Sequence, residues 1–322
     1  MVKKLLCYES CSFSPYYNLA IEQMLFKNLA SEESALFLWR NDKTVVIGRH
    51  QSAYLECNLP AMKEDNILLA RRLTGGGAVY HDKENLNFTF LNYKDDFDLN
   101  RNFNILLDAL YQIGICATLT GRNDITIEGK KFSGNAYFKG KRVCYHHGTL
   151  MIEVNVDALK SYLRVSSLKL CTKGVKSVSS RVINLRQISS HLGVEDLKNS
   201  IKSAYSAAYS LPLEFVSNAM WEQKNLKNEE NFLSSREWLL GETPDFISWR
   251  EERFKWGEVV MGMTSSGTIE LYSDALEVAL FEYIQKSLKE NPKLPLKALD
   301  GFTSLQNEII TDLNSLLKSW SF

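Results

Sequence analysis

The chain has 322 residues, of which 45% are hydrophobic and 24% are charged, a composition that is ordinary for a globular protein. This length is enough for one large domain and a small one. Its 38 basic and 38 acidic residues balance, which argues against a nucleic-acid binder because such proteins usually carry a basic excess.

Short strands and helices are predicted in the first part of the chain. We expect a helix over 15–30, because Ser14 can cap it and Pro15 suits the first helical position. Strands are expected over 35–40 and 44–48, and the short polar stretch between them predicts a hairpin loop.

The middle of the chain combines a helix with a run of strands. Apolar residues recur at helical spacing over 99–113, and Tyr111 falls on the same face as they do. Strand patterns dominate 116–154, with turns at 128–129 and 139–140. Further helices are expected over 156–165 and 197–209.

The C-terminal part begins with a polar stretch over 216–231, which we interpret as a surface loop. A helix over 232–240 is expected to end at Gly241, because glycine favours helix C-termini. The remaining predicted elements are a hairpin over 253–272 with its tip at 265–267, and helices over 274–290 and 304–320.

Hairpins outnumber the helical crossovers that an all-parallel sheet requires. We therefore predict an α+β (α/β-type) fold with mixed, mainly antiparallel sheets and flanking helices. A domain boundary is expected near 247–252. The predicted units are a large domain over 1–246 and a small α+β accessory domain over 252–322.

The sequence also indicates where the protein functions. No apolar run approaches the ~20 residues that span a bilayer, and the apolar N-terminal stretch is too short for a signal peptide. The cysteines form no CxxC pair and no zinc-type spacing, so we interpret them as reduced. We predict a cytoplasmic protein without membrane partners, or an organelle-matrix protein if a presequence has been removed.

The most informative stretch is 71–81, which reads Arg-Arg-Leu-Thr-Gly-Gly-Gly-Ala-Val-Tyr-His between two expected strands. Consecutive glycines weaken a strand, because each loses much backbone entropy and packs no side chain. They suit a backbone that lies against a ligand, where their N–H groups can face an anion. The stretch follows neither the Walker nor the Rossmann pattern.

Further segments follow in order: Gly121-Arg122-Asn123-Asp124, Lys131-Phe132-Ser133-Gly134-Asn135-Ala136 and His146-His147-Gly148-Thr149-Leu150. Together with the glycine-rich stretch, they resemble the lipoate–protein ligase family over 18–185, and more weakly to the C-terminus. The resemblance is specific, because separate motifs match in the same order.

The resemblance implies an ATP-dependent ligase that takes lipoate as its substrate. Lipoate would react with ATP to give lipoyl-AMP and pyrophosphate, with Mg²⁺ neutralising the departing anion. The lipoyl group would then pass to a lysine of apo lipoyl domains, in acyltransferase subunits of 2-oxoacid dehydrogenases or in the glycine-cleavage H protein. The domain over 1–246 would bind lipoate and ATP, and the C-terminal unit would do no chemistry itself.

Lys131 is the predicted catalytic residue. The resemblance places the family's lysine two positions before the Ser133-Gly134 pair, which favours Lys131 over the neighbouring Lys130. Its ammonium would touch the acyl carbonyl and an α-phosphate oxygen, and would stabilise developing negative charge. The plain alternative is a solvated lysine on a β-turn.

The glycine-rich stretch would form the lipoate-binding loop. Arg72 would pair with phosphate through its planar guanidinium, and His81 would close the loop, although a histidine packed in a sheet is the commoner outcome. A structural glycine bend is the plain alternative for the whole stretch. The backbone donors of this loop would come from Gly75, Gly76, Gly77 and Ala78.

The resemblance assigns further positions to lipoate, adenylate and metal. Asp124, with Asn123 beside it, would lie near the phosphates and contact Mg²⁺, and an Asx-turn is the plain alternative. His147 and Gly148 would flank the lipoyl chain. The remaining positions are Trp39 and Glu22 at the far end of the lipoyl tunnel, and Lys173 and Ser177 in the adenylate-binding loop.

The sequence leaves two alternative functions open. A lipoyl or octanoyl transferase of the same fold would lack ATP chemistry, and an octanoyltransferase would need a nucleophilic cysteine. Cys144 and Cys171 lie in the right region but in no recognisable thioester-forming motif. A non-catalytic carrier-binding protein is the other alternative, and the presence of Lys131 and Asp124 argues against it.

Overall fold

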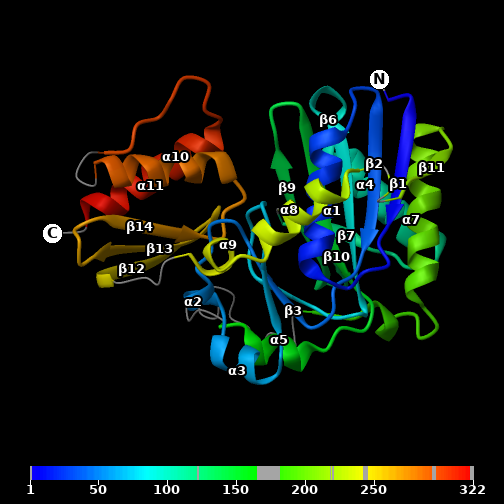
Figure 1. The fold of residues 1–322 in the computed structure, drawn as a ribbon, viewed down its shortest axis with the longest axis horizontal. Helices are drawn as coiled ribbons and strands as arrows, with labels where there is room; N and C mark the ends of the chain where they lie inside the picture. The colour runs from blue at the N-terminus through cyan, green and yellow to red at the C-terminus, as the bar shows by residue number, and fades with distance from the viewer. Residues whose placement is uncertain are drawn as a thin grey trace.

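Figure 1 shows a larger unit that contains the N-terminus, which corresponds to the predicted large domain, and a smaller unit formed by the C-terminal residues. The larger part consists of sheets flanked by helices, and the smaller part packs beside it. The computed structural model describes residues 2–121, 123–164, 182–217, 219, 221–241, 246–291 and 295–319.

A mixed sheet forms the centre of the large domain. Within the described ranges its strands lie in the order β11 (Leu213–Phe215), β1 (Lys4–Glu9), β2 (Glu33–Trp39), β6 (Asn85–Tyr93), β10 (Val143–Met151), β9 (Lys130–Lys139), β8 (Asp124–Ile127) and β7 (Thr118–Thr120). β1 pairs in parallel with β11 and β2. The other neighbours are antiparallel, which confirms the predicted mainly antiparallel α+β fold.

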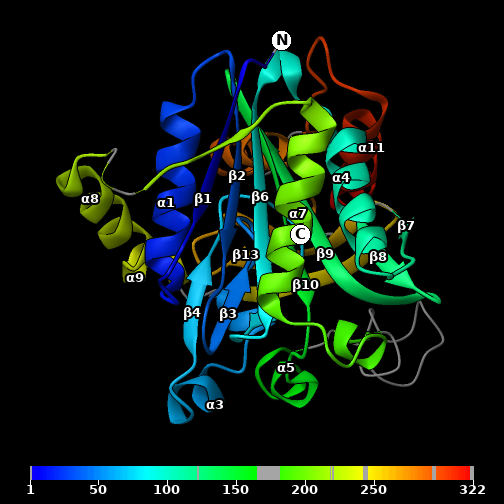
Figure 2. The same ribbon diagram turned by 90° about the vertical axis from the view of Figure 1, so that its right-hand side faces the viewer.

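Helices cover both faces of this sheet. α4 (Leu99–Gln112) and α7 (Val194–Tyr209) lie on one face, and α1 (Pro15–Asn28) lies on the other (Figure 2). Because side chains alternate along a strand, Leu36 packs toward α4 and α7 while Phe37 packs toward α1. The large domain therefore has an apolar core on each side of the sheet.

The helices predicted over 15–30 and 99–113 form as α1 and α4, with one correction to the buried face of α4. Ser14 caps α1, because its side chain accepts a hydrogen bond from the backbone N–H of Tyr17. Asp98 caps α4 in the same way. Tyr111, however, is 73% exposed, so its predicted place on the buried face of α4 is wrong. Ile105 and Ala109 fill that face instead.

A second sheet contradicts the predicted hairpin. β3 (Thr44–Ile47) lies between β4 (Leu68–Arg71) and β5 (Val79–His81), whereas β2 belongs to the large sheet. The stretch between β2 and β3 carries the chain from one sheet to the other. Buried Asn41 fixes this crossing, because its amide accepts from Asn18 at 3.0 Å and lies 3.1 Å from Nδ1 of His81. The short helices α2 (Ala53–Glu56) and α3 (Leu59–Glu64) follow β3.

The predicted surface loop over 216–231 is wrong in its second half. α8 (Gln223–Leu233) occupies it, and buried Leu226 packs in the same core as α1. The single helix predicted over 232–240 is wrong at its start, because residues 232–233 end α8. α9 (Arg236–Leu240) is a separate helix, capped by Ser235 and ending at Gly241 as expected. The strands over 116–154 are confirmed, and α5 (Val156–Tyr162) confirms the short helix that follows them.

Arg71 joins the second sheet to α9. Its guanidinium donates to the carbonyl oxygens of Trp238 at 2.8 Å and Leu239 at 2.9 Å. The indole N–H of Trp238 donates back to the Arg71 carbonyl at 3.0 Å. Burial lowers the pKa of Arg71 to about 10, so the side chain stays charged at neutral pH.

The C-terminal unit has its own core and sheet. Its elements are β12 (Phe246–Phe254), β13 (Gly257–Thr264), β14 (Ile269–Ser273), α10 (Val278–Glu290) and α11 (Ser304–Lys318). The β13–β14 hairpin and both helices confirm the predicted elements, although α10 begins later than expected. The residues 247–252, predicted as the boundary, lie inside β12, and the division into two domains stays a prediction.

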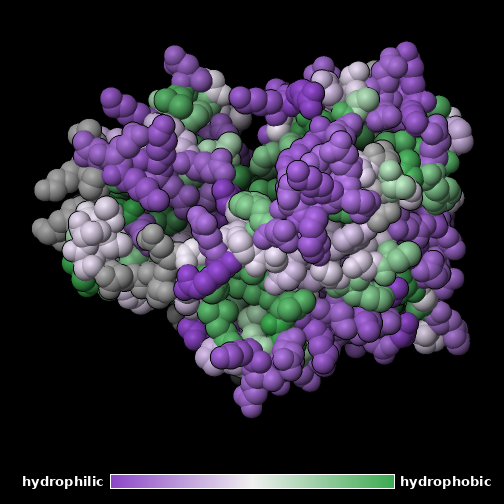
Figure 3. All heavy atoms as spheres, in the orientation of Figure 1, coloured by the Kyte–Doolittle hydropathy of each residue, from purple (hydrophilic) through white to green (hydrophobic). Residues whose placement is uncertain are grey.

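Hydrophilic side chains cover most of the face in Figure 3, and hydrophobic ones gather below the junction of the two units, near α2 and β3. Exposed Leu55 and Leu68 belong to α2 and β4, respectively. Across the described ranges, no helix is both long enough and apolar enough to cross a membrane.

Candidate active site

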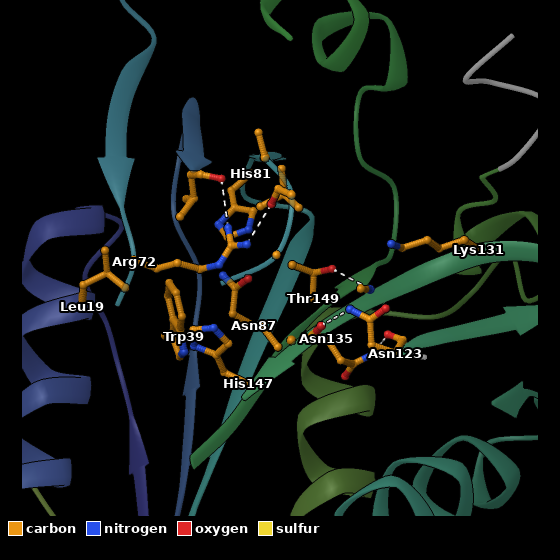
Figure 4. Close-up of a pocket in the computed structure, with 18 residues that line it drawn as sticks. Leu19, Trp39, Arg72, His81, Asn87, Asn123, Lys131, Asn135, His147 and Thr149 are labelled. Carbon is orange, nitrogen blue, oxygen red and sulfur yellow. Dashed lines mark hydrogen bonds between the residues drawn. The ribbon is translucent and has the colours of Figure 1, made fainter. Parts of the chain in front are cut away.

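A pocket lies where the glycine-rich stretch and the second sheet meet α1 and the middle strands of the large sheet (Figure 4). Most of the residues predicted from the sequence line it, namely Trp39, Arg72, Gly76, Gly77, Ala78, His81, Asn123, Lys131, His147 and Gly148. Glu22, Gly75 and Asp124 lie behind this lining and bond to residues in it. Lys173 and Ser177 lie outside the described residues.

Lys131 lies at one end of the pocket, opposite Trp39 (Figure 4). Its Nζ is 2.7 Å from Oδ1 of Asp124, and these side chains are 38% and 33% exposed. Partly exposed ion pairs are weak, so the ammonium can exchange this carboxylate for an anionic ligand at little cost. The structure therefore brings the predicted lysine and acid together.

The glycine-rich stretch forms a tight loop between β4 and β5. Gly76 has φ +90°, a conformation that favours glycine. Its carbonyl oxygen lies so near Gly48 that a Cβ there would approach it to 2.2 Å. Gly48 is therefore part of the loop in space, although it lies far from the motif in sequence.

Arg72 supports this loop from inside. Its guanidinium donates to the carbonyl oxygens of Gly75 and Gly77, each at 2.8 Å, and of Val46 at 3.2 Å. Nε donates to Oγ1 of Thr74 at 3.0 Å. Burial lowers the pKa of Arg72 to about 10. The donors that the sequence-based prediction assigned to phosphate are used within the loop here, and a phosphate contact by Arg72 stays a prediction.

His81 closes the loop and is also packed in the sheet. It is 3% exposed, and its Nδ1 lies 3.1 Å from the side-chain amide of Asn41. Burial, together with the charges of Arg72 and His147, lowers the pKa of His81 to about 3. The imidazole is therefore neutral at physiological pH and forms part of the pocket wall.

A chain of hydrogen bonds connects α1 to the glycine-rich loop. Glu22 is fully buried, and its Oε1 accepts from Thr89 at 2.7 Å and lies 2.8 Å from Nδ1 of His147. The other ring nitrogen of His147 lies 2.8 Å from Oγ1 of Thr74. The indole N–H of Trp39 donates to Thr89 at 3.2 Å. Glu22 thus orients the pocket wall from behind.

Gly148 and Asn135 bring β9 and β10 close together beside the pocket. A Cβ at Gly148 would lie 2.6 Å from Oδ1 of Asn135 and 2.7 Å from Cζ of Phe88. That Oδ1 lies 3.0 Å from Nε2 of His146, and the Asn135 amide donates to the carbonyl of Asn123 at 2.9 Å. Burial lowers the pKa of His146 to about 3, so this histidine is a neutral core residue.

The C-terminal unit contacts the glycine-rich loop directly. The carbonyl oxygen of Ala275 would lie 2.0 Å from a Cβ at Gly75, and it accepts from the N–H of Gly76 at 3.4 Å. The N–H of Ser273 donates to the carbonyl of His50 at 2.9 Å. The segment before α10 therefore packs on the loop and contributes to the shape of the site.

Sequence reasoning missed several polar residues of the pocket. Thr74 and Thr89 join the hydrogen-bond chain, and Asn87, Asn135 and Thr149 line the cavity. One signal was available, because Asn87 and Thr89 alternate with phenylalanines along a buried strand. Polar residues at alternate positions of a buried strand indicate a second, polar environment on one face.

Cys144 does not provide the nucleophile that an octanoyltransferase would need. It is buried in β10 and does not line the pocket. Burial raises the pKa of its thiol, which disfavours the reactive thiolate. Cys171 lies outside the described residues.

The comparison with known proteins agrees with this geometry. The lipoyl protein ligase A/B catalytic domain family matches residues 14–206. A lipoate-protein ligase A from Psychrobacter cryohalolentis is 39% identical over 299 residues, which cover 89% of this chain and 88% of that protein. One from Bdellovibrio bacteriovorus is 38% identical over 301 residues, with 89% and 88% covered.

Solved structures share the fold. The crystal structure of P. falciparum LipL1 in complex with lipoate has a TM-score of 0.83 at 28% identity, and covers 98% of this chain and 100% of that one. A lipoate-protein ligase A bound with ATP has a TM-score of 0.61 at 25% identity, with 75% and 99% covered. A bi-partite ligase from Thermoplasma acidophilum, described with its E2 lipoyl domain, has a TM-score of 0.64 at 26% identity, with 77% and 100% covered. The chain therefore belongs to the lipoyl protein ligase A/B family, as the sequence motifs predicted.

Proposed function

We propose that this protein is an ATP-dependent lipoate–protein ligase. One observation carries the proposal: Lys131 and the backbone of the glycine-rich loop face a single pocket whose opposite end is closed by Trp39. A lipoyl chain needs an apolar slot with few polar anchors. Activation of its carboxylate needs a cation and backbone donors at the other end of that slot.

Each step uses residues of this chain. The carboxylate of lipoate attacks the α-phosphate of ATP, which forms the acyl-adenylate and releases pyrophosphate. Lys131 stabilises the negative charge that develops on the acyl and phosphate oxygens. An anion at the loop would replace the Ala275 carbonyl as the acceptor for the N–H of Gly76. In the second step a lysine amine of the acceptor attacks the acyl carbon, and AMP leaves.

We infer that Asp124, whose carboxylate lies beside Lys131, would hold Mg²⁺. The described residues contain no group of three or more His, Cys, Asp or Glu side chains that could hold a metal ion. Mg²⁺ in nucleotide sites is usually bound by one or two carboxylates together with phosphate oxygens. The site therefore fits an ion that arrives with ATP, whose charge would neutralise the departing pyrophosphate.

We infer that the acceptors are apo lipoyl domains of acyltransferase subunits of 2-oxoacid dehydrogenases, or the glycine-cleavage H protein. The family relationship supports lipoyl domains as the class of acceptor. Transfer to each purified apo domain, followed by mass spectrometry, would distinguish the two acceptors.

Pyrophosphate release from ATP with free lipoate and no acceptor tests the proposed reaction. Lipoate-dependent release is expected for the ligase. If release is absent but lipoyl still passes from synthetic lipoyl-AMP to an acceptor domain, the protein is a transferase. If neither reaction occurs while lipoate binds, it is a carrier-binding protein.

Replacing Trp39 with alanine is expected to weaken lipoate binding and to allow bulkier carboxylic acids. The indole closes one end of the pocket, and its removal leaves space there. The measurement is kcat/KM for lipoate and for a bulkier acid. Trp221→Ala is the control, because Trp221 is buried in the same core as Trp39 but does not line the pocket. If both variants lose only thermal stability, Trp39 is a core residue and not a selectivity residue.

A further inference from the structure

Two buried N–H groups in the pocket wall have no partner among the described residues. They are Nδ2 of Asn87, on β6, and Nε2 of His81, at the end of β5. The two residues are 1% and 3% exposed, and both line the pocket. Buried polar atoms are nearly always hydrogen-bonded in folded proteins. A bound molecule is therefore expected to complete these two.

The hydrogen bonds around His81 make its free nitrogen a donor. Asn18 donates to Oδ1 of Asn41 at 3.0 Å, which fixes the orientation of the Asn41 amide. Nδ2 of Asn41 then donates to Nδ1 of His81 at 3.1 Å. A neutral imidazole that accepts at Nδ1 carries its proton on Nε2. The unpartnered atom of His81 is therefore an N–H.

The free group of Asn87 is also a donor. Its Oδ1 accepts from the amide of Asn85 at 2.9 Å, which leaves the Nδ2 hydrogens unused. Asn87 lies opposite Trp39 in the β2–β6 register, and the indole N–H of Trp39 is already bonded to Thr89. The wall at this end thus presents an aromatic ring with two N–H groups beside it.

These donors lie away from the reacting end of the pocket. Figure 4 shows Trp39, Asn87 and His81 together on the side opposite Lys131. An acid activated beside Lys131 would place its tail among them. A hydrocarbon tail would leave both donors buried and unpaired, which is unfavourable. A tail that ends in acceptor atoms would satisfy them, and sulfur is a weak acceptor.

We propose that Asn87, with His81, determines specificity for the tail of the acid, and selects a tail that carries acceptor atoms such as the sulfurs of a dithiolane ring. This inference rests on the proposed function. It assigns to Asn87 a role in substrate selection that is separate from activation of the carboxylate.

The test compares lipoate with a pentanoic acid that carries a cyclopentyl ring in place of the dithiolane. The analogue has a similar shape but no acceptor atom in its tail. Wild-type protein is expected to favour lipoate in kcat/KM by about 10-fold, which corresponds to the lower part of the usual cost of leaving one buried donor unpaired. Equal use of the two acids by the wild type would overturn the proposal without any variant.

Asn87→Leu then locates the effect. This substitution removes the donor and keeps a side chain of similar size, so the preference for lipoate is expected to disappear. Thr149→Val is the matched control. Thr149 also lines the pocket, but its hydroxyl is already bonded, because it accepts a hydrogen bond from the N–H of Gly134. It should lower turnover of both acids equally. An unchanged preference in folded Asn87→Leu contradicts the role of Asn87.

Direct binding separates this inference from the proposed function. If the wild type activates neither acid, the ligase proposal fails. In that case, calorimetry can still measure the affinity of the protein for each of the two acids, and the ratio of these affinities tests the proposed selectivity. Tighter binding of lipoate, lost in Asn87→Leu, supports the inference, and equal binding refutes it.

Discussion

Replacing Lys131 with alanine is expected to lower the rate of lipoate adenylation about 10²–10³-fold, the usual loss when one preorganised charge-stabilising group is removed. Transfer from supplied lipoyl-AMP should fall as well, because the same ammonium would stabilise charge on the acyl oxygen in both steps. Pyrophosphate release and acceptor lipoylation measure the two steps separately. Thermal stability should change little, because the Lys131–Asp124 pair is partly exposed.

Lys130→Ala is the matched control. Lys130 is exposed and adjacent in β9, so its side chain points to the other side of the strand. Its removal should leave both rates within a few-fold of the wild type. Equal losses in the two variants, or a loss only at Lys130, would show that the catalytic assignment is wrong.

Gly75→Ala is expected to reduce adenylation about 10²-fold, because misplacement of positioning groups by about 1 Å has effects of this size. The added Cβ would lie 2.0 Å from the carbonyl oxygen of Ala275 and 2.9 Å from Cα of Leu276. Both are backbone atoms, so the loop or the C-terminal unit must move. Pyrophosphate release measures the activity, and the midpoint of thermal unfolding should fall.

Gly77→Ala serves as the control for stability. Gly77 is in the same loop, but a Cβ there meets nothing within 4 Å. Its thermal midpoint should equal that of the wild type. If Gly75→Ala is as stable and as active as the wild type, the contact between the C-terminal unit and the loop has no functional role.

Capping residues and the spacing of apolar residues predicted α1, α4 and the strands over 116–154 well. α1 and α4 begin at good capping residues and carry recurring apolar positions, so short stretches of sequence are sufficient to identify them. The glycine-rich stretch was equally informative, because few other structures need consecutive glycines. Partner choice between strands was not predictable in this way. β2 and β3 are adjacent in sequence, yet pairing with distant strands places them in different sheets.

The misassigned loop has a similar cause. α8 is rich in Asn, Lys and Glu and has few apolar positions, so its sequence is typical of a polar surface segment. It is a helix because Leu226 and Leu233 reach the core beside α1. Tertiary packing therefore decides the structure of this segment, as it does for most helices in water.

The sequence predicted which residues belong to the candidate site more accurately than it predicted what each of them does there. The motif identified Arg72, but only the structure shows that its donors bond to the loop itself. Thr74 belongs to the glycine-rich stretch, but the sequence does not indicate its role, because that role depends on His147 lying beside it in the folded chain. Roles that arise from contacts between distant segments need coordinates.

The link between Arg71 and α9 has a consequence for synthesis of the protein. Arg71 and Leu239 are 168 residues apart, a distance that a ribosome covers in roughly 10–30 s at typical elongation rates. Until then the arginine lacks its acceptors on α9. β1 waits longer for its neighbour β11, because Leu5 pairs with Leu213, and it presents an open edge in the meantime. The nascent chain is therefore expected to need protection from aggregation until almost the whole large domain has emerged.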